Sequence, residues 1–318
     1  MLPEVMKLSI VIPVFNSEKT LAPLVARLQG CLSGDAFEIV LVNDGSRDRS
    51  EAVCMDMAHR YANVQFIGLR RNFGEFNAVL CGLNYVSGQY IVIIDDDFQN
   101  PPEAILTLVD AADAGGYDVV YSRYARKQHA WFRNAGSRLL NRLATHLIGK
   151  PDELYLSSFK LIRYEVVQEI IRYTGPYPYI DGLIFRATRN VGSVEVPHHP
   201  RQEGQSNYTL KKLISLFLNV LIGYSVWPLR VFTLVGAGLF LLGILVGFGL
   251  LISSAAGWFS VRGWYIVAWA VFLLAGLQLL FLGMLSEYLG KLFMMQSGLP
   301  PYVVKHEMVR KSSVGSRQ

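Results

Sequence analysis

Between residue 7 and about residue 120, runs of consecutive apolar residues alternate with segments whose apolar residues recur every three or four positions. The runs are typical of buried strands, and the segments are typical of amphipathic helices. A regular repeat of strand, helix and strand favours an α/β fold with a doubly wound, mostly parallel sheet. The predicted strands are 8–14, 37–42, 64–69, 89–94, 157–162 and 191–197, and the predicted helices are 18–32, 76–85, 131–148, one ending near 61 and one beginning near 101.

Three consecutive carboxylates, Asp95, Asp96 and Asp97, follow the strand that is expected to end at Ile94, and the amide of Gln99 comes two residues later. Open α/β sheets bind ligands in the crevice beyond the carboxyl ends of their strands. Carboxylate and amide oxygens suit a hard cation such as Mg²⁺ or Mn²⁺, and such a cation would neutralise a diphosphate. Taken alone, the segment is equally compatible with an acidic turn after a core strand.

The sequence has no glycine-rich motif of the kinds that cradle phosphates. No Gly-x-Gly-x-x-Gly follows the strand predicted at 8–14, and the chain contains no P-loop motif. Phosphate binding is therefore expected to depend on a metal ion and on cationic side chains.

Two uncharged runs near the C-terminal end predict a membrane hairpin. No charged residue lies between Arg230 and Arg262, and a second uncharged run, 263–286, ends at Glu287. Each run is long enough to cross a bilayer once. The expected spans are about 231–252 and 264–286.

Basic residues on both sides of the hairpin predict its orientation. The linker between the spans carries only Arg262, so the positive-inside rule places both termini and the N-terminal α/β domain in the cytoplasm. Three scattered cysteines without a Cys-x-x-Cys motif agree with a reducing compartment. The basic residues before and after the hairpin are Lys211, Lys212, Arg230, Lys291, Lys305, Arg310, Lys311 and Arg317.

We interpret the net charge of +5 as a feature that favours contact with anionic lipid headgroups at the membrane surface, and not as a sign of nucleic-acid binding. The apolar segment 210–226 begins with two lysines and is followed by Pro228, which predicts an interfacial helix that leads into the membrane. The expected organisation is a cytoplasmic α/β domain at 1–207, the interfacial helix at 208–229, the hairpin at 230–290 and a cytoplasmic C-terminal tail at 291–318.

Six segments, together with the predicted hairpin, resemble the inverting family 2 glycosyltransferases. The similarity is to the polyprenyl-phosphate glycosyltransferases, such as dolichol-phosphate mannose synthase and bacterial undecaprenyl-phosphate sugar transferases. The similarity covers nearly the whole chain. The six segments occur in the same order as in the family, and this order is more specific than any one segment. The segments are 12–16, 42–46, 71–74, 95–102, 201–206 and 286–290.

The resemblance implies a GT-A type fold and transfer of a sugar from a nucleotide diphosphate sugar, expected to be UDP-linked, to undecaprenyl phosphate. The reaction would take place at the cytoplasmic face of the bacterial inner membrane, with Mg²⁺ or Mn²⁺, and its lipid-linked product would serve envelope glycan or lipopolysaccharide modification. The family also suggests a homo-oligomer, with a tetramer as the guess.

The resemblance assigns roles to matched positions. The nucleotide pocket would contain Pro13, Glu18, Asp44 and Asp96, and the catalytic residues would be Asp95, Asp97 and Arg201. The metal ligands would be Asp97 and Gln99. The phosphates of donor or acceptor would bind to Arg201 and Ser206.

Two other functions compete with this interpretation. A polysaccharide-elongating transferase of the same family would need a Gln-x-x-Arg-Trp segment, which the sequence lacks. A non-catalytic subunit that binds a nucleotide sugar or a lipid phosphate could use the same pocket.

The sequence departs from the family pattern at Glu75, Asp96, Asn207 and the segment 157–160. These departures leave the identity of the transferred sugar open.

Overall fold

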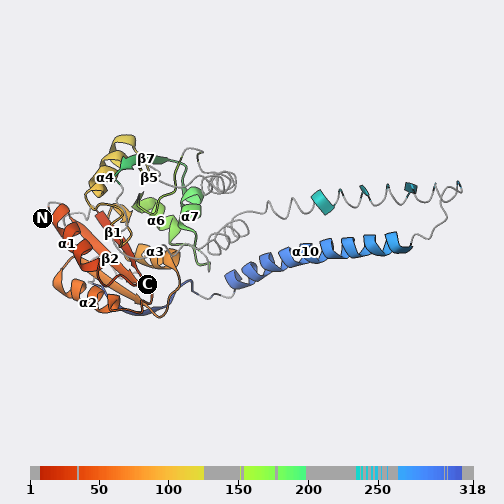
Figure 1. Ribbon diagram of the computed structural model, residues 1–318. Helices are drawn as coiled ribbons and strands as arrows, with labels where there is room; N and C mark the ends of the chain where they lie inside the picture. The colour runs from red at the N-terminus through yellow and green to blue at the C-terminus, as the bar shows by residue number, and fades with distance from the viewer. Residues whose placement is uncertain are drawn as a thin grey trace. The chain divides into compact units, whose positions relative to one another are not determined.

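The structure is a computed structural model that describes residues 8–33, 36–124, 151, 154–175, 178–197, 264–296, 298 and 300–309, with scattered positions between 234 and 256 (Figure 1). The chain divides into two compact units. The first contains residues 1–209 and 298–318, and the second contains residues 210–297.

Within the described residues of the first unit, eight strands form one sheet in the order β7-β5-β6-β4-β1-β2-β3-β8. β1 pairs in parallel with β2 and β4, and β2 pairs in parallel with β3. β6 and β8 are antiparallel to their neighbours. The predicted mostly parallel sheet is therefore confirmed. The strands are β1 (Leu8–Val14), β2 (Phe37–Asn43), β3 (Val64–Leu69), β4 (Tyr90–Ile93), β5 (Val119–Tyr124), β6 (Lys160–Arg163), β7 (Val191–Val196) and β8 (Val304–Met308).

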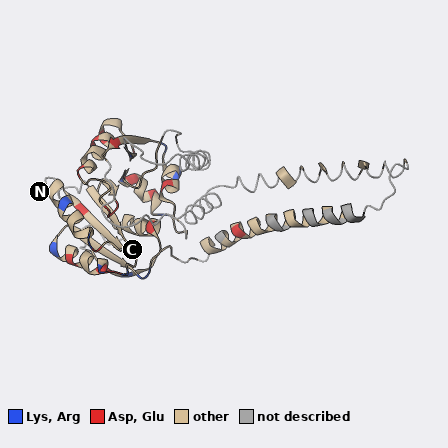
Figure 2. Ribbon diagram, viewed as in Figure 1, with Lys and Arg blue, Asp and Glu red and all other residues tan. Residues whose placement is uncertain are grey.

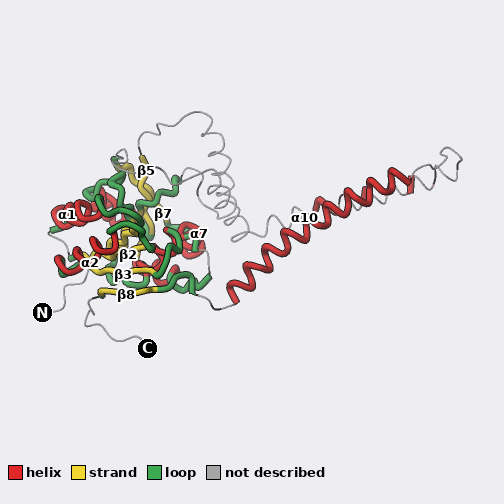
Figure 3. The backbone as a smooth tube through the Cα atoms, turned by 60° about the horizontal axis from the view of Figure 1, so that its bottom comes forward, coloured by secondary structure: helices red, strands yellow, loops and turns green. Residues whose placement is uncertain are grey.

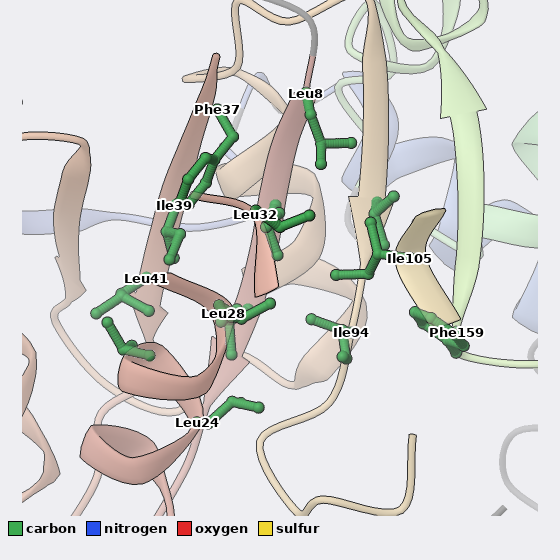
Figure 4. Close-up of a cluster of buried hydrophobic side chains, with 14 of the residues drawn as sticks. Leu8, Leu24, Leu28, Leu32, Phe37, Ile39, Leu41, Ile94, Ile105 and Phe159 are labelled. Atoms are coloured by element: carbon green, nitrogen blue, oxygen red, sulfur yellow. The ribbon is translucent and has the colours of Figure 1, made fainter. Parts of the chain in front are cut away.

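The main core lies between one face of this sheet and three helices, α1 (Leu21–Cys31), α2 (Ser50–Arg60) and α4 (Ala104–Gly115). Figure 4 shows Leu24 and Leu28 of α1 and Ile105 of α4 beside the strand residues that they cover. Alternate strand residues point to this face because successive side chains of a strand point to opposite faces.

Helix α3 (Glu75–Leu83) packs against the other face of the sheet. A Cβ atom at Gly82 would lie 2.5 Å from Cγ1 of Val11 and 3.1 Å from Cγ2 of Val42. Glycine at this position therefore allows the helix to approach the sheet closely. The remaining described helices of this unit are α6 (Tyr164–Ile170) and α7 (Ile180–Ala187).

The C-terminal part of the chain adds a strand that the sequence does not predict. The segment 304–308 lies in the expected C-terminal tail, yet it forms β8 and pairs with β3 at the edge of the sheet (Figure 3). The predicted helix 131–148 lies outside the described residues.

In the second unit, α10 (Trp264–Gln296) is 33 residues long, which corresponds to about 50 Å. It contains one acidic residue, Glu287 (Figure 2). Within the described residues, one helical segment, Leu274–Gln296, is long and apolar enough to cross a membrane. The predicted helix 208–229 and most of the predicted span 231–252 lie outside the described residues, so the two-helix hairpin stays a prediction.

Candidate active site

The candidate site lies at the carboxyl ends of three adjacent parallel strands, β4, β1 and β2. The amide of Asp44, just after β2, donates to the carbonyl oxygen of Val14 at 2.9 Å. The amide of Ile94, just after β4, donates to the carbonyl oxygen of Val11 at 3.1 Å. The fold thereby brings the loops that follow these strands to one edge of the sheet, as the sequence predicts.

Asp44 is buried and holds a neighbouring loop. Its two carboxylate oxygens accept the backbone amides of Phe73 at 2.7 Å and Gly74 at 2.9 Å. Burial raises the pKa of Asp44 to about 6, although these two hydrogen bonds act in the opposite direction. A Cβ atom at Gly45 would lie 2.5 Å from the carbonyl carbon of Arg71, so the two loops touch through their backbones.

The loop after β1 is bonded to the loop after β2. The amide of Asn16 donates to Oγ of Ser46 at 3.0 Å, and Oε2 of Glu18 accepts the amide of Arg49 at 3.0 Å. Pro13 lies in β1, directly opposite Val42 of β2. The structure thus brings Pro13, Glu18 and Asp44, three of the residues predicted to bind the nucleotide, to the same edge.

The Asp96 carboxylate is buried in surroundings that are unfavourable for its charge. Burial raises its pKa to about 7, and the charges of Asp95 and Asp97 add to this effect, while hydrogen bonds from Ser17 and from the backbone of Phe15 oppose it. Its Oδ2 atom has no hydrogen-bond partner among the described residues. A cation close to this run would relieve both the repulsion and the lost hydration.

Asp97 and Gln99 flank an unusual turn. The amide of Gln99 donates to Oδ1 of the buried Asp97 at 3.1 Å. Phe98, between them, adopts a left-handed conformation with φ of +59° and buries its side chain in the core. Left-handed backbone is unfavourable for a bulky residue, so the core contacts of Phe98 fix the turn that carries the two predicted metal ligands.

Within the described residues, no group of three or more His, Cys, Asp or Glu side chains has the arrangement of a metal site. This result does not conflict with the predicted ligands, because Mg²⁺ is usually held by one or two carboxylates together with substrate phosphates. The unpartnered Oδ2 of Asp96 and the crowded charges around it fit such a cation.

Three elements beside the acidic run supply side chains that the sequence interpretation did not place in the site. Oγ of Ser158, just before β6, donates to Oδ2 of Asp95 at 2.5 Å. Lys160 in β6 forms a buried ion pair with Asp181 in α7. Burial raises the pKa of Glu75, the first residue of α3, to about 7; the charge of Asp95 adds to this effect and that of Lys160 opposes it.

The sequence contains a weak signal for these residues. Glu75 and the segment 157–160 are both departures from the family pattern, but nothing in the sequence indicates that they approach Asp95. Arg201 and Ser206, which are predicted to bind phosphates, lie outside the described residues.

Known proteins match the chain over most of its length. The undecaprenyl-phosphate 4-deoxy-4-formamido-L-arabinose transferase of Edwardsiella ictaluri is 33% identical over 303 residues, which cover 94% of this chain and 93% of that protein. The protein of the same name from Pseudomonas aeruginosa is 36% identical over 291 residues, which cover 90% of this chain and 85% of that protein.

Among solved structures, the fold is similar to that of glucosyl-3-phosphoglycerate synthase from Mycobacterium tuberculosis in complex with Mn²⁺, UDP and phosphoglyceric acid. The TM-score is 0.52 at 18% sequence identity, and the match covers 68% of this chain and 76% of that chain. The family model described as glycosyl transferase family 2 matches residues 9–171. With a family match over half of its length and relatives above 30% identity, this chain belongs to glycosyltransferase family 2.

Proposed function

We propose that this protein is an inverting glycosyltransferase that moves a sugar from a nucleotide diphosphate sugar, with UDP as the expected nucleotide, to undecaprenyl phosphate. One observation carries the proposal: the Asp44 loop and the Asp95–Gln99 loop lie at the carboxyl ends of β2 and β4, the two parallel strands on either side of β1. The relatives named as undecaprenyl-phosphate sugar transferases, which match 90% or more of the chain, support the lipid acceptor.

The side chains around the loops would bind and orient the donor. Pro13, Glu18 and Asp44 would contact the nucleoside, because they lie together at the edge formed by β1 and β2. Asp97 and Gln99 would hold Mg²⁺ or Mn²⁺, and this cation, when bound, supplies Lewis-acid stabilisation of the departing diphosphate. Similar structures that contain UDP with Mn²⁺ or Mg²⁺ agree with this choice.

The proposed acceptor does not need a strong general base to activate its attacking oxygen. The second pKa of a phosphate monoester is near 6, so the attacking oxygen is already anionic at about pH 7. The protein would mainly have to place this oxygen behind the anomeric carbon and stabilise the leaving group. Asp95 would orient the sugar or the metal shell, while Arg201 and Ser206 would bind the phosphates. A single displacement inverts the anomeric carbon.

The position of β8 supports a membrane segment that leaves and returns on the same side. β8 follows residues 210–297 in the chain, yet it lies in the same sheet as strands that precede them. A segment that joins two parts of one folded sheet must cross a membrane an even number of times. With the uncharged runs 231–252 and 263–286, two crossings follow, and the flanking lysines and arginines favour the cytoplasmic side.

The test is release of UDP by the purified full-length protein with undecaprenyl phosphate and Mn²⁺. The donors would be UDP-glucose, UDP-N-acetylglucosamine and UDP-4-deoxy-4-formamido-L-arabinose. We expect lipid-dependent release with one donor and a loss of about 100-fold or more in Asp97→Ala. Asp110→Ala is the matched control, because Asp110 is an exposed carboxylate on α4. Nucleotide binding without lipid-dependent release from any donor would refute the proposal and favour a non-catalytic binding subunit.

A further inference from the structure

Strands β4 and β6 are antiparallel neighbours, and their register aligns Asp95 with Ser158. The pairs run from Tyr90 with Arg163 to Ile93 with Lys160. Extending this register by two residues beyond the last pair places Asp95 opposite Ser158. The proximity of the two side chains therefore follows from strand pairing and not from a chance contact of flexible loops.

The backbone on both sides of Ser158 is held by buried groups. Phe159 is fully buried in the core, and its carbonyl oxygen accepts the amide of Ser122 at 3.1 Å. Oγ of Ser157 accepts the amide of Phe159 at 3.2 Å and the hydroxyl of Ser122 at 2.7 Å. These contacts fix the position from which Ser158 reaches Asp95.

The hydrogen bond itself is short and charge-assisted. Oγ of Ser158 lies 2.5 Å from Oδ2 of Asp95, within the range for a hydroxyl that donates to a carboxylate. Such bonds to charged groups contribute more than neutral hydrogen bonds. This one restricts the rotation of a carboxylate that has Asp96 beside it and Glu75 close by.

We propose that Ser158 is a positioning residue for the transfer reaction: it holds the Asp95 carboxylate in the orientation that the reaction uses. Ser158 acts through Asp95 and does not need to touch the substrate. The inference rests on the proposed function, in which Asp95 is a catalytic residue. The neighbouring carboxylates repel Asp95, and the hydrogen bond from Ser158 opposes a rotation driven by this repulsion.

The experiment compares two adjacent serines in the UDP-release assay. Ser158→Ala removes the donor to Asp95, whereas Ser157→Ala removes a buried hydroxyl that bonds to Ser122 and Phe159. We expect Ser158→Ala to lower kcat by about tenfold to 100-fold, with KM for the nucleotide sugar and the melting temperature nearly unchanged. Ser157→Ala should lower the melting temperature and reduce kcat less than Ser158→Ala does, because the hydroxyl that donates to Asp95 is still present. Ser158→Thr keeps the hydroxyl and should restore most of the lost kcat.

Each outcome decides the inference. A wild-type kcat in Ser158→Ala would overturn the inference. It would also be overturned if Ser158→Thr lost as much kcat and as much melting temperature as Ser158→Ala, because this result indicates a structural role alone. The inference would also be overturned if the Asp95→Asn variant had the same turnover as wild type. No turnover by wild type would refute the proposed function, and the inference would fall with it.

Discussion

Lys160 of β6 forms an ion pair with Asp181 of α7, and the two side chains are only 4% and 9% exposed. The hydroxyl of Tyr121 donates to the same carboxylate oxygen at 2.9 Å, and the ammonium of Lys160 lies 5.1 Å from the centre of the Tyr121 ring. The pair thus ties the antiparallel strand next to the acidic run to a helix on the sheet.

Removing one member of this pair should be far more harmful than removing both. Lys160→Met leaves the buried Asp181 without its cation, and breaking a buried pair in this way costs about 3–5 kcal/mol of the free energy of unfolding. In the double variant Lys160→Met/Asp181→Leu no buried charge remains, so we expect a smaller loss. Denaturant unfolding of wild type, Lys160→Met, Asp181→Leu and the double variant measures the coupling energy between the two residues. Additive losses in the free energy of unfolding would contradict the predicted dependence of each charge on the other.

Asp44 offers a second test, because its two oxygens accept two backbone amides at once. Asp44→Asn keeps the shape but replaces one acceptor by an NH₂ group, which faces the amide of Phe73 or Gly74 and cannot accept its proton. We expect a loss of about 1–3 kcal/mol in stability and weaker binding of UDP, measured by calorimetric titration. Asp110→Asn, on the exposed side of α4, is the control. Unchanged UDP affinity in Asp44→Asn would remove this residue from the predicted nucleotide pocket.

Much of the fold and part of the site follow from local sequence patterns. The strands β1 and β2 are continuous apolar runs because both faces of a parallel sheet are covered, and this pattern is visible without a structure. The carboxyl ends of parallel strands share one edge, so the positions of Asp44 and Asp97 relative to the sheet follow from the same pattern.

Contacts between distant segments could not be predicted in this way. The bond between Ser158 and Asp95 depends on β6 entering the sheet between β4 and β5, and no local pattern specifies this order. β8 is hidden for a different reason: it is five residues long and none of its residues is fully buried, so it lacks the apolar signal of the inner strands.

The strand β8 is nevertheless attached to the rest of the first unit by several side chains. Lys305 pairs with Glu51 of α2 at 2.9 Å, and the hydroxyl of Tyr85 donates to Glu307 at 2.5 Å. The ring of His306 lies 5.3 Å from that of Phe66. These contacts cover the edge of β3, which would otherwise expose unpaired backbone groups.

We therefore expect β8 to contribute to the stability of the first unit. A chain that ends after Pro300 keeps α10 but loses β8, whereas a chain that ends after Val309 keeps both. The shorter chain should unfold at a lower temperature, by about 2–4 °C for each kcal/mol lost in a domain of this size, and should aggregate more readily through β3. Equal melting temperatures of the two truncated proteins would contradict this role.

The stability of the first unit should also depend on the protonation of Glu75. Burial and the charge of Asp95 raise the pKa of Glu75 to about 7 in the folded protein, from about 4.5 in an unfolded chain. Between these two values the folded state binds more protons than the unfolded state, so stability decreases as the pH rises from about 4.5 to 7. The desolvation concerns the carboxyl group, whereas Glu75 as a whole residue is exposed, so solvent screening limits the effect to about 1 kcal/mol or less.

Glu75→Gln removes this titration and identifies its contribution. The variant should gain stability relative to wild type at pH 8 and show a smaller difference at pH 4.5, in thermal unfolding with EDTA to exclude divalent cations. Glu165→Gln is the matched control, because Glu165 is an exposed carboxylate in the first turn of α6. The two variants should therefore diverge as the pH rises. A pH-independent difference between Glu75→Gln and wild type would show that the Glu75 charge is not destabilised in the folded state.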